Sequence, residues 1–254
     1  MDKKPTILVT NDDGIAAPGI YALANSLKTI GRVIVVAPSS GRSAVGHAIT
    51  LSDPLRVWSH QLANDLTGYA VNGMPADCVK IAYWALMDGP PDLVVSGINL
   101  GPNTGINTIY SGTVSAATEG AILGVPSFAV SLGTFVNPDF GYAAQFAVRV
   151  AKKLLKEGLP QGVALNVNVP AVPESEIKGV QFTRQGMALY REEFDKRTDP
   201  RGGTYYWLTG QKQDQEISLD VDDGAMAANY VSITPVHYDL THHHVLNQLR
   251  TWQF

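Results

Sequence analysis

Residues 7–14 read Ile7-Leu8-Val9-Thr10-Asn11-Asp12-Asp13-Gly14, a short apolar run that ends in an amide, two carboxylates and a glycine. Similar runs rich in branched residues recur at 33–37, 93–95, 128–132 and 163–169. Segments with apolar residues at helical spacing separate these runs. This alternation predicts an α/β fold, in which helices cover both faces of a doubly wound, mostly parallel sheet.

The spacing of apolar residues predicts four helices between the runs, over residues 20–30, 78–86, 114–122 and 143–155. Gly158 and Pro160 end the last of them. Residues 48–71 instead alternate apolar and polar side chains without a helical period, which indicates a β-hairpin extension ahead of the second helix.

The sequence changes character after Pro170. Residues 179–190, 204–209 and 231–236 are typical of strands separated by polar loops, and residues 240–252 are compatible with a final helix. A β-rich tail with aromatic residues usually packs on the main sheet or on another subunit. We therefore expect one domain over 1–254, with an α/β core at 1–170 and an extension at 171–254 that serves oligomerisation.

Composition excludes several classes of protein. The chain has 254 residues, a formal net charge of −4 and no run of charged residues, so a nucleic acid polymer is not an expected partner. One cysteine, Cys78, excludes an intramolecular disulfide framework and fits a reducing compartment. No stretch approaches the roughly 20 apolar residues of a membrane span, and the start does not read as a signal peptide. We expect a cytoplasmic protein with no membrane partner.

Polar residues follow three of the predicted strands. The first ends in Asn11-Asp12-Asp13-Gly14, the second in residues 38–43, and the third in Ser96-Gly97-Ile98-Asn99, followed by Gly101-Pro102-Asn103. Ligands of open α/β sheets bind in the crevice beyond the carboxyl ends of the strands. We therefore expect these three ends to converge on one site.

Asp12 and Asp13 are neighbouring carboxylates, which repel one another unless a cation or a proton lies between them. With no His or Cys nearby, hard oxygen ligands favour Mg²⁺ or Mn²⁺ over zinc. Ser43 can add a hydroxyl and Asn99 a carbonyl oxygen. In the structural alternative, one aspartate caps the next helix and Gly14 only turns the chain. Ser43 and Asn99 are then turn or cap residues.

Ser111-Gly112-Thr113 opens the third predicted helix. A helix N-terminus offers unpaired N–H groups and a partial positive charge, so two hydroxyls beside a glycine make a phosphate site. The alternative is an ordinary Ser or Thr N-cap. Neither a Walker A motif nor a G-x-G-x-x-G fingerprint occurs, which argues against the two usual nucleotide folds and against an NAD-dependent oxidoreductase.

Other residues carry less weight. Three consecutive histidines, 242–244, would diverge rather than chelate one ion, Cys78 falls on an apolar helix face, and Glu119 reads as a surface residue. His47 is a substrate contact, a proton donor or a solvated loop residue. The run Tyr205-Tyr206-Trp207 stacks on a base or contacts another subunit.

Several blocks together resemble the survival protein SurE family. They occur in order from near the start to about residue 240, and jointly they are highly specific: Asn11 to Gly14 with Ala17-Pro18-Gly19, Val36 to Ser43, Gly73 to Cys78, Val95 to Asn103, Tyr110 to Val114 and Val231 to Pro235.

The resemblance implies a metal-dependent phosphatase that hydrolyses nucleoside 5′- and 3′-monophosphates and some short polyphosphate. It implies one Mg²⁺ or Mn²⁺ per subunit on Asp12, Asp13, Ser43 and Asn99, and a phosphate pocket of Asn103, Ser111, Gly112 and Thr113. Asp12, Asp13 and Asn11 would be the catalytic residues. The implied assembly is a homodimer or homotetramer whose C-terminal segments are exchanged. The competing hypothesis is a nucleotide-binding regulatory or scaffold oligomer without turnover.

Overall fold

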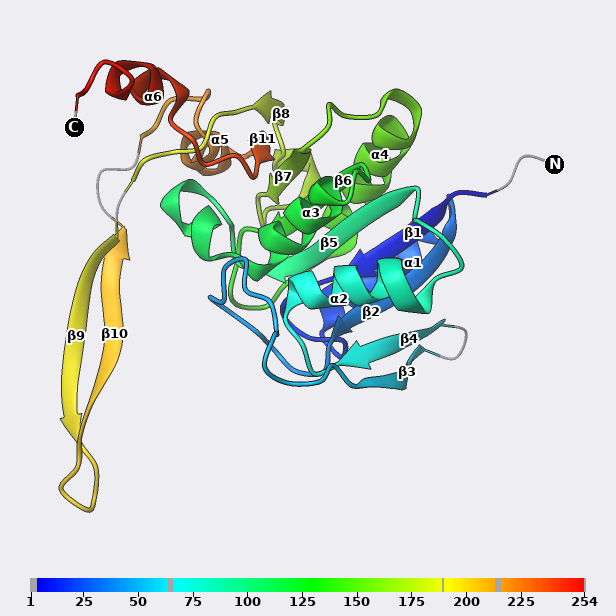
Figure 1. Cartoon of the computed structure of the whole chain (residues 1–254), viewed down its shortest axis with the longest axis horizontal. Helices are drawn as coiled ribbons and strands as arrows, with labels where there is room; N and C mark the ends of the chain where they lie inside the picture. The colour runs from blue at the N-terminus through cyan, green and yellow to red at the C-terminus, as the bar shows by residue number, and fades with distance from the viewer. Residues whose placement is uncertain (1–3, 64–65, 189, 213–215, 254) are drawn as a thin grey trace.

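A nine-stranded sheet in the order β3-β4-β2-β1-β5-β6-β7-β11-β8 organises the computed structural model of this chain (Figure 1). The structure describes residues 4–63, 66–188, 190–212 and 216–253. None of the helices within these ranges is long and apolar enough to span a membrane.

Six parallel strands form the centre of the sheet. They are β1 (Thr6–Thr10), β2 (Arg32–Pro38), β4 (Leu66–Val71), β5 (Leu93–Leu100), β6 (Ser127–Leu132) and β7 (Val163–Val169). The chain first builds outward from β1 through β2 to β4, then returns to place β5 on the other side of β1. The strand order therefore reverses between β1 and β5, the position at which open α/β sheets bind their ligands.

Helices cover both faces of this sheet (Figure 1). On one face α1 (Pro18–Leu27) packs against α4 (Gly141–Glu157). On the other face α2 (Pro75–Ile81), which continues as a π-helical turn at Ala82–Leu86, packs against α3 (Gly112–Ile122). Fully buried strand residues alternate between the faces, because Ile7 and Val9 join the apolar cluster under α1 and Leu8 joins the cluster under α2.

Both edges of the sheet carry additional strands. On one edge β3 (Val57–Ala63) pairs antiparallel with β4 as a hairpin. On the other edge β11 (Tyr230–His237) pairs antiparallel with β7, and β8 (Gly179–Phe182) pairs parallel with β11. Two strands that follow residue 170 thus belong to the main sheet.

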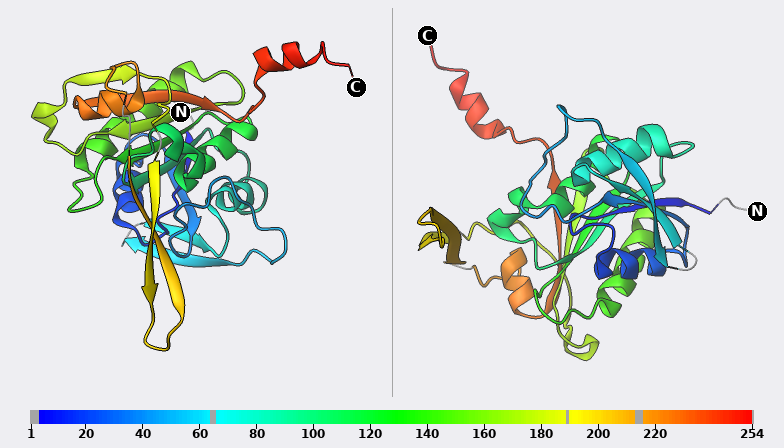
Figure 2. Two further views of the ribbon diagram at one scale, coloured as in Figure 1. Left: turned by 90° about the vertical axis from the view of Figure 1, so that its left-hand side faces the viewer. Right: turned by 90° about the horizontal axis from the view of Figure 1, so that it is seen from below.

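The remaining strands, β9 (Tyr190–Thr198) and β10 (Thr204–Lys212), form a two-stranded ribbon that projects from the rest of the molecule (Figures 1 and 2). Helix α6 (His243–Leu249) extends from the body at the C-terminal end (Figure 2). The C-terminal part also contains two short helical elements, α5 (Asp222–Ala227) and the 3₁₀ segment Glu174–Glu176. A second 3₁₀ segment, Gly105–Tyr110, leads into α3.

The predicted doubly wound, mostly parallel α/β fold is confirmed, including the hairpin and all four core helices. The prediction of one strand over 179–190 is wrong. Strand β8 ends at Phe182 because the backbone of Arg184 turns to bond with Asp220 and Asp222 instead of the sheet, and β9 begins only at Tyr190. The sequence analysis also missed α5. Exchange of the C-terminal segment between subunits stays a prediction.

Phe128 is the largest fully buried side chain among the described residues, and it lies near the start of β6. We expect Phe128→Ala to lower the free energy of unfolding by about 3–5 kcal/mol, since truncation leaves a cavity in the core. The matched control is Phe182→Ala, because this ring on β8 is 79% exposed. Urea unfolding measures both, and equal losses would contradict the assignment of Phe128 to the core.

Candidate active site

The side chain of Asp12, directly after β1, contacts the N-terminus of α3. The Thr113 hydroxyl donates a hydrogen bond to Asp12 Oδ1. Gly112 is so close that a Cβ atom there would lie 2.8 Å from Asp12 Cβ. A side chain at position 112 would therefore push the carboxylate and the helix apart. The contact places a carboxylate at the end of a helix that carries partial positive charge.

Burial raises the pKa of Asp12 to about 6, and repulsion from the neighbouring Asp13 adds to the effect although hydrogen bonds from Thr113 oppose it. Burial raises the pKa of Asp13 as well, against a hydrogen bond from the Leu100 amide. The two carboxylates thus lie close enough to repel one another. A cation or a proton between them would relieve the repulsion.

Three strand ends meet at this position, as the sequence predicted. Asp13 Oδ2 accepts a hydrogen bond of 3.1 Å from the Leu100 amide at the end of β5. The Arg42 amide, in the loop after β2, donates to the carbonyl oxygen of Asp12 over 2.7 Å. The site therefore lies at the carboxyl ends of β1, β2 and β5, where the strand order reverses.

Asn11 braces the turn that carries the two aspartates. Its side-chain nitrogen donates to the Gly14 carbonyl over 2.9 Å, and its side-chain oxygen accepts from the Gly14 amide over 3.2 Å. Gly14 has a φ of +97°, a conformation that favours glycine. Both polar atoms of the Asn11 side chain are therefore engaged in shaping this turn, and its catalytic role stays a prediction.

The two neutral residues predicted as cation ligands lie on segments that reach the aspartates. Ser43 is exposed and follows Arg42, whose amide is bonded to Asp12. Asn99 lies at the end of β5, next to the Leu100 amide that bonds Asp13. Its side-chain nitrogen donates to the Gly101 carbonyl over 2.7 Å. The side-chain oxygen is thus the atom suited to a cation.

Ser111 is the N-cap of α3, since its hydroxyl oxygen accepts a hydrogen bond of 3.1 Å from the Val114 amide. Ser111 therefore acts as an N-cap, which was the structural alternative in the sequence analysis. Capping does not use the backbone N–H groups of the first helical turn, Gly112 and Thr113, through which a helix N-terminus binds anions.

Asn103 lies in a buried hydrogen-bond network, and its role in phosphate binding stays a prediction. Its side-chain nitrogen donates to Ser131 Oγ over 2.9 Å, and its backbone amide donates to Asn168 Oδ1 over 2.8 Å. The side chains of Asn166 and Asn168, both on β7, donate to its carbonyl oxygen. Two asparagines at alternate positions of a buried apolar strand were the sequence signal for this network, which the sequence analysis missed.

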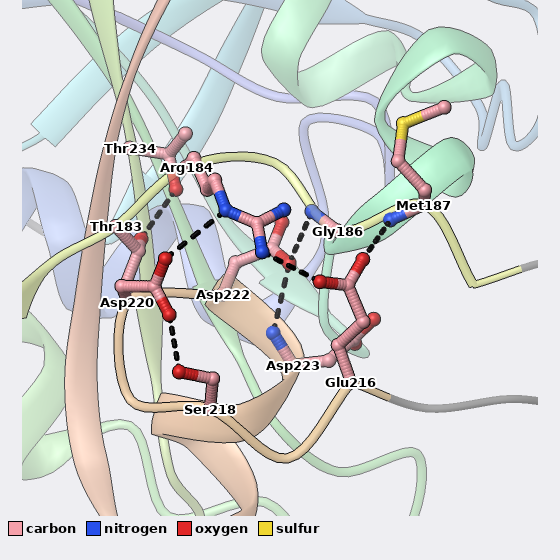
Figure 3. A network of polar contacts seen from close by, with 10 residues as sticks. All are labelled: Thr183, Arg184, Gly186, Met187, Glu216, Ser218, Asp220, Asp222, Asp223 and Thr234. Atoms are coloured by element: carbon pink, nitrogen blue, oxygen red, sulfur yellow. Dashed lines mark hydrogen bonds and ion pairs between the residues drawn. The ribbon is translucent and has the colours of Figure 1, made fainter.

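A second residue that sequence reasoning missed is Asp222, at the start of α5. Its carboxylate is buried and accepts hydrogen bonds from the amides of Gly105 (2.8 Å) and Gly186 (2.9 Å). Figure 3 shows Asp222 beside an exposed cluster in which Arg184 pairs with Glu216 and Asp220. The C-terminal extension thereby fixes the segment 105–110 that leads into α3.

Glu119 is buried, so its reading as a surface residue is wrong. Its carboxylate lies 2.8 Å from His47 Nε2 and 2.7 Å from Lys80 Nζ, and these two partners offset the cost of burying its charge.

Cys78 is buried in the core, as expected. The histidines at 242–244 lie on the exposed C-terminal segment, where His243 pairs with Asp239.

The donor set fits a hard divalent cation. Within the described residues no group of three or more His, Cys, Asp or Glu side chains is arranged to hold a metal, so neutral oxygens must complete the shell around Asp12 and Asp13. Thr10, the last residue of β1, and Ser96, within β5, are register partners, and their buried hydroxyls have no hydrogen-bond partner in the described part of the chain. A polar ligand or water at this edge would satisfy them.

The fold and this geometry define an α/β protein with a paired-aspartate site at the amino end of a helix. The family model of the survival protein SurE matches residues 7–192. The chain belongs to the SurE family.

Relatives match along nearly the whole chain. The 5′-nucleotidase SurE of Syntrophobacter fumaroxidans is 51% identical over 97% of this chain and 98% of its own. The 5′-nucleotidase SurE of Chlorobium limicola is 50% identical over 98% and 97% of the two chains. The crystal structure of the SurE protein from Aquifex aeolicus superposes with a TM-score of 0.84 at 44% identity, covering 97% of this chain and 98% of that one.

The raised pKa of Asp12 predicts a pH-dependent stability of the cation-free protein. Its ordinary value is 3.8 and its value in the folded chain is about 6, so folding favours the protonated form. The resulting stabilisation is complete at acid pH and is lost as pH rises through about 6, which amounts to ~1 kcal/mol between about pH 5 and pH 8.

Thermal unfolding in EDTA at the two pH values measures this loss. We expect Asp12→Asn to lack it and Asp53→Asn, at an exposed loop position, to keep it. The same pH dependence in Asp12→Asn as in the unsubstituted protein would show that another group causes it.

Proposed function

We propose that this chain is a divalent-cation-dependent phosphatase that hydrolyses nucleoside 5′-monophosphates, and also 3′-monophosphates and short polyphosphate, to release phosphate. The observation that carries the proposal is the contact of Asp12 with Thr113 and Gly112, which joins a carboxylate pair to a helix N-terminus. Relatives that are about half identical over nearly the full chain are named 5′-nucleotidases, which supports the choice of substrate.

In the proposed site, Asn103 and the residues that open α3, Ser111, Gly112 and Thr113, bind oxygens of the substrate phosphate. A phosphate bound there would lie beside Asp12 and Asp13, so three negative groups would meet. Asp12, Asp13, Ser43 and Asn99 would hold one Mg²⁺ or Mn²⁺. When bound, this cation supplies the positive charge that neutralises the phosphoryl group and makes an attacking water more acidic.

The chain's own groups then have separate tasks. Asn11 and Gly14 hold the two aspartates in the turn after β1. The hydrogen bond from Thr113 keeps the Asp12 carboxylate next to the bound phosphate. Asp12 either accepts the proton of the attacking water or attacks phosphorus itself. Rapid acid quench distinguishes these two roles, because only the second forms an aspartyl phosphate.

The proposal includes a homodimer or homotetramer with exchanged C-terminal segments. Its support is the ribbon of β9 and β10, on which Phe194, Tyr206, Trp207 and Leu208 are each more than half exposed. Isolated ribbons of this kind are marginally stable in water, and burial against a second copy would stabilise them. A cytoplasmic location also stays a prediction.

The first test is release of phosphate from 5′-AMP with Mn²⁺. We expect Asp12→Asn and Asp13→Asn each to lower kcat/KM more than ~100-fold, because each removes a charged ligand of the cation and the transition state loses stabilisation. EDTA should abolish turnover, and added Mn²⁺ should restore it. The control variant is Asp53→Asn. Binding of AMP without release of phosphate would instead support the regulatory alternative.

A second test probes the close approach of α3 to Asp12. We expect Gly112→Ala to lower kcat/KM for 5′-AMP by ~100-fold, because the added methyl group displaces the reacting groups. Gly41→Ala is the matched control, since a Cβ there would meet only atoms 3.5 Å away or farther, at ordinary van der Waals distance. Equal activity of the two variants would refute the role of this contact.

A further inference from the structure

Glu119 is a charged residue that the proposed reaction does not use. It lies in the third turn of α3, only 2% exposed, and binds two groups from other parts of the chain. Lys80 Nζ, on α2, lies 2.7 Å from Oε1, and His47 Nε2 lies 2.8 Å from Oε2. Together these contacts outweigh the effect of burial and lower the pKa of Glu119. The carboxylate is therefore ionised at neutral pH and couples three segments.

His47 is the member of this network that lies on the loop carrying Ser43. We call residues 39–50 the Ser43 loop. Polar contacts fix the loop at several places along its length. Before Ser43, the Arg42 amide bonds the Asp12 carbonyl over 2.7 Å. After it, the Gly46 amide bonds the Tyr110 carbonyl over 2.9 Å, next to the Ser111 cap.

The far end of the loop is held by acidic side chains on two helices. Asp77, on α2, accepts hydrogen bonds from the amide (3.1 Å) and the hydroxyl (2.6 Å) of Thr50. Glu119, on α3, binds His47. Apolar burial contributes little to holding this end, because Ile49 is 43% exposed and Leu51 is 85% exposed. Contacts to the two acids therefore hold this end of the loop.

We propose that His47 is a positioning residue for the cation site. Through its hydrogen bond with Glu119, itself fixed by Lys80, it holds the Ser43 loop so that Ser43 stays beside Asp12 and Asp13. The inference rests on the proposed function, because it takes Ser43 as a cation ligand. It differs from the readings of His47 as a substrate contact or a proton donor, since the ring acts on the loop and not on the reacting atoms.

Binding of Mn²⁺ to the cation-free protein tests the inference without turnover. Electron paramagnetic resonance of free Mn²⁺ gives the dissociation constant of each variant. Residues that orient metal ligands typically change affinity by 10–100-fold, so we expect His47→Ala to bind Mn²⁺ at least ~10-fold more weakly. His47→Gln keeps a nitrogen donor near the position of Nε2 and should restore affinity to within ~3-fold of the original. His60→Ala, on β3, is the matched control and should bind like the unsubstituted protein.

Turnover of 5′-AMP separates positioning from chemistry. We expect saturating Mn²⁺ to restore the kcat of His47→Ala, because the loop then closes on the bound ion, whereas Asp12→Asn stays inactive. Thermal unfolding in EDTA should give the same midpoint for His47→Ala and His47→Gln within ~3 °C.

Each result has a defined meaning. If the unsubstituted protein binds Mn²⁺ and His47→Ala binds it equally well, the positioning role is overturned and the proposed function stands. If the unsubstituted protein does not bind Mn²⁺, the proposed cation site fails and the inference fails with it. A kcat that excess Mn²⁺ does not restore would place His47 in the chemistry. A large drop in the midpoint of both His47 variants would make the residue structural.

Discussion

The contact between the Asp12 carboxylate and the first turn of α3 is the constraint on which the site depends. It joins the end of the central strand to a helix about 100 residues later in the chain, and the Thr113 hydroxyl closes it. Only glycine fits at position 112, because a Cβ atom would meet the Asp12 side chain. The position of the helix, the turn after β1 and the charge state of Asp12 are therefore linked through one close approach.

Burial at this close approach disfavours the charged forms of Asp12 and Asp13, and the surrounding hydrogen bonds do not fully compensate. Asp12 and Asp13 are both desolvated, and burial raises the pKa of each. The helix N-terminus offsets only part of this for Asp12. Glu119 shows the opposite arrangement, since its contacts with His47 and Lys80 lower its pKa in spite of burial. Burial thus dominates the pKa of Asp12 and of Asp13, whereas Glu119 forms a satisfied structural ion pair with Lys80.

Sequence reasoning predicted the fold well, because the strands and helices of the core each carry a strong periodic signal. The runs at 7–9 and 163–169, for example, lie in β1 and β7. Local turns were harder to predict. Strand β8 ends after Phe182 because the backbone of Arg184 forms hydrogen bonds with residues 220–222, and no local sequence pattern reveals these bonds.

The meeting of the three strand ends at one edge followed from topology, so Asp12 and Asp13 were predicted to lie near the segments of Ser43 and Asn99. The hydrogen-bond partners of single polar residues could not be predicted from the topology. Glu119 looked like a surface residue because its partners, Lys80 and His47, come from distant segments. The buried network of Asn103 was not predicted either, because its partners Asn166 and Asn168 come from β7. Pairings of this kind are set by tertiary contacts and are not encoded by spacing within the chain.

The hydrogen bonds of Asp222 bear on how the molecule unfolds. This carboxylate, far beyond residue 170, accepts the amide of Gly105 in the segment that leads into α3. Strands β8 and β11 also complete the main sheet from the same C-terminal part. A fragment that ended at residue 170 would expose the edge of β7 and leave the Gly105 amide without its acceptor. The sheet and the C-terminal strands that extend it therefore form a single cooperative unit. The core and the extension unfold together and not one after the other.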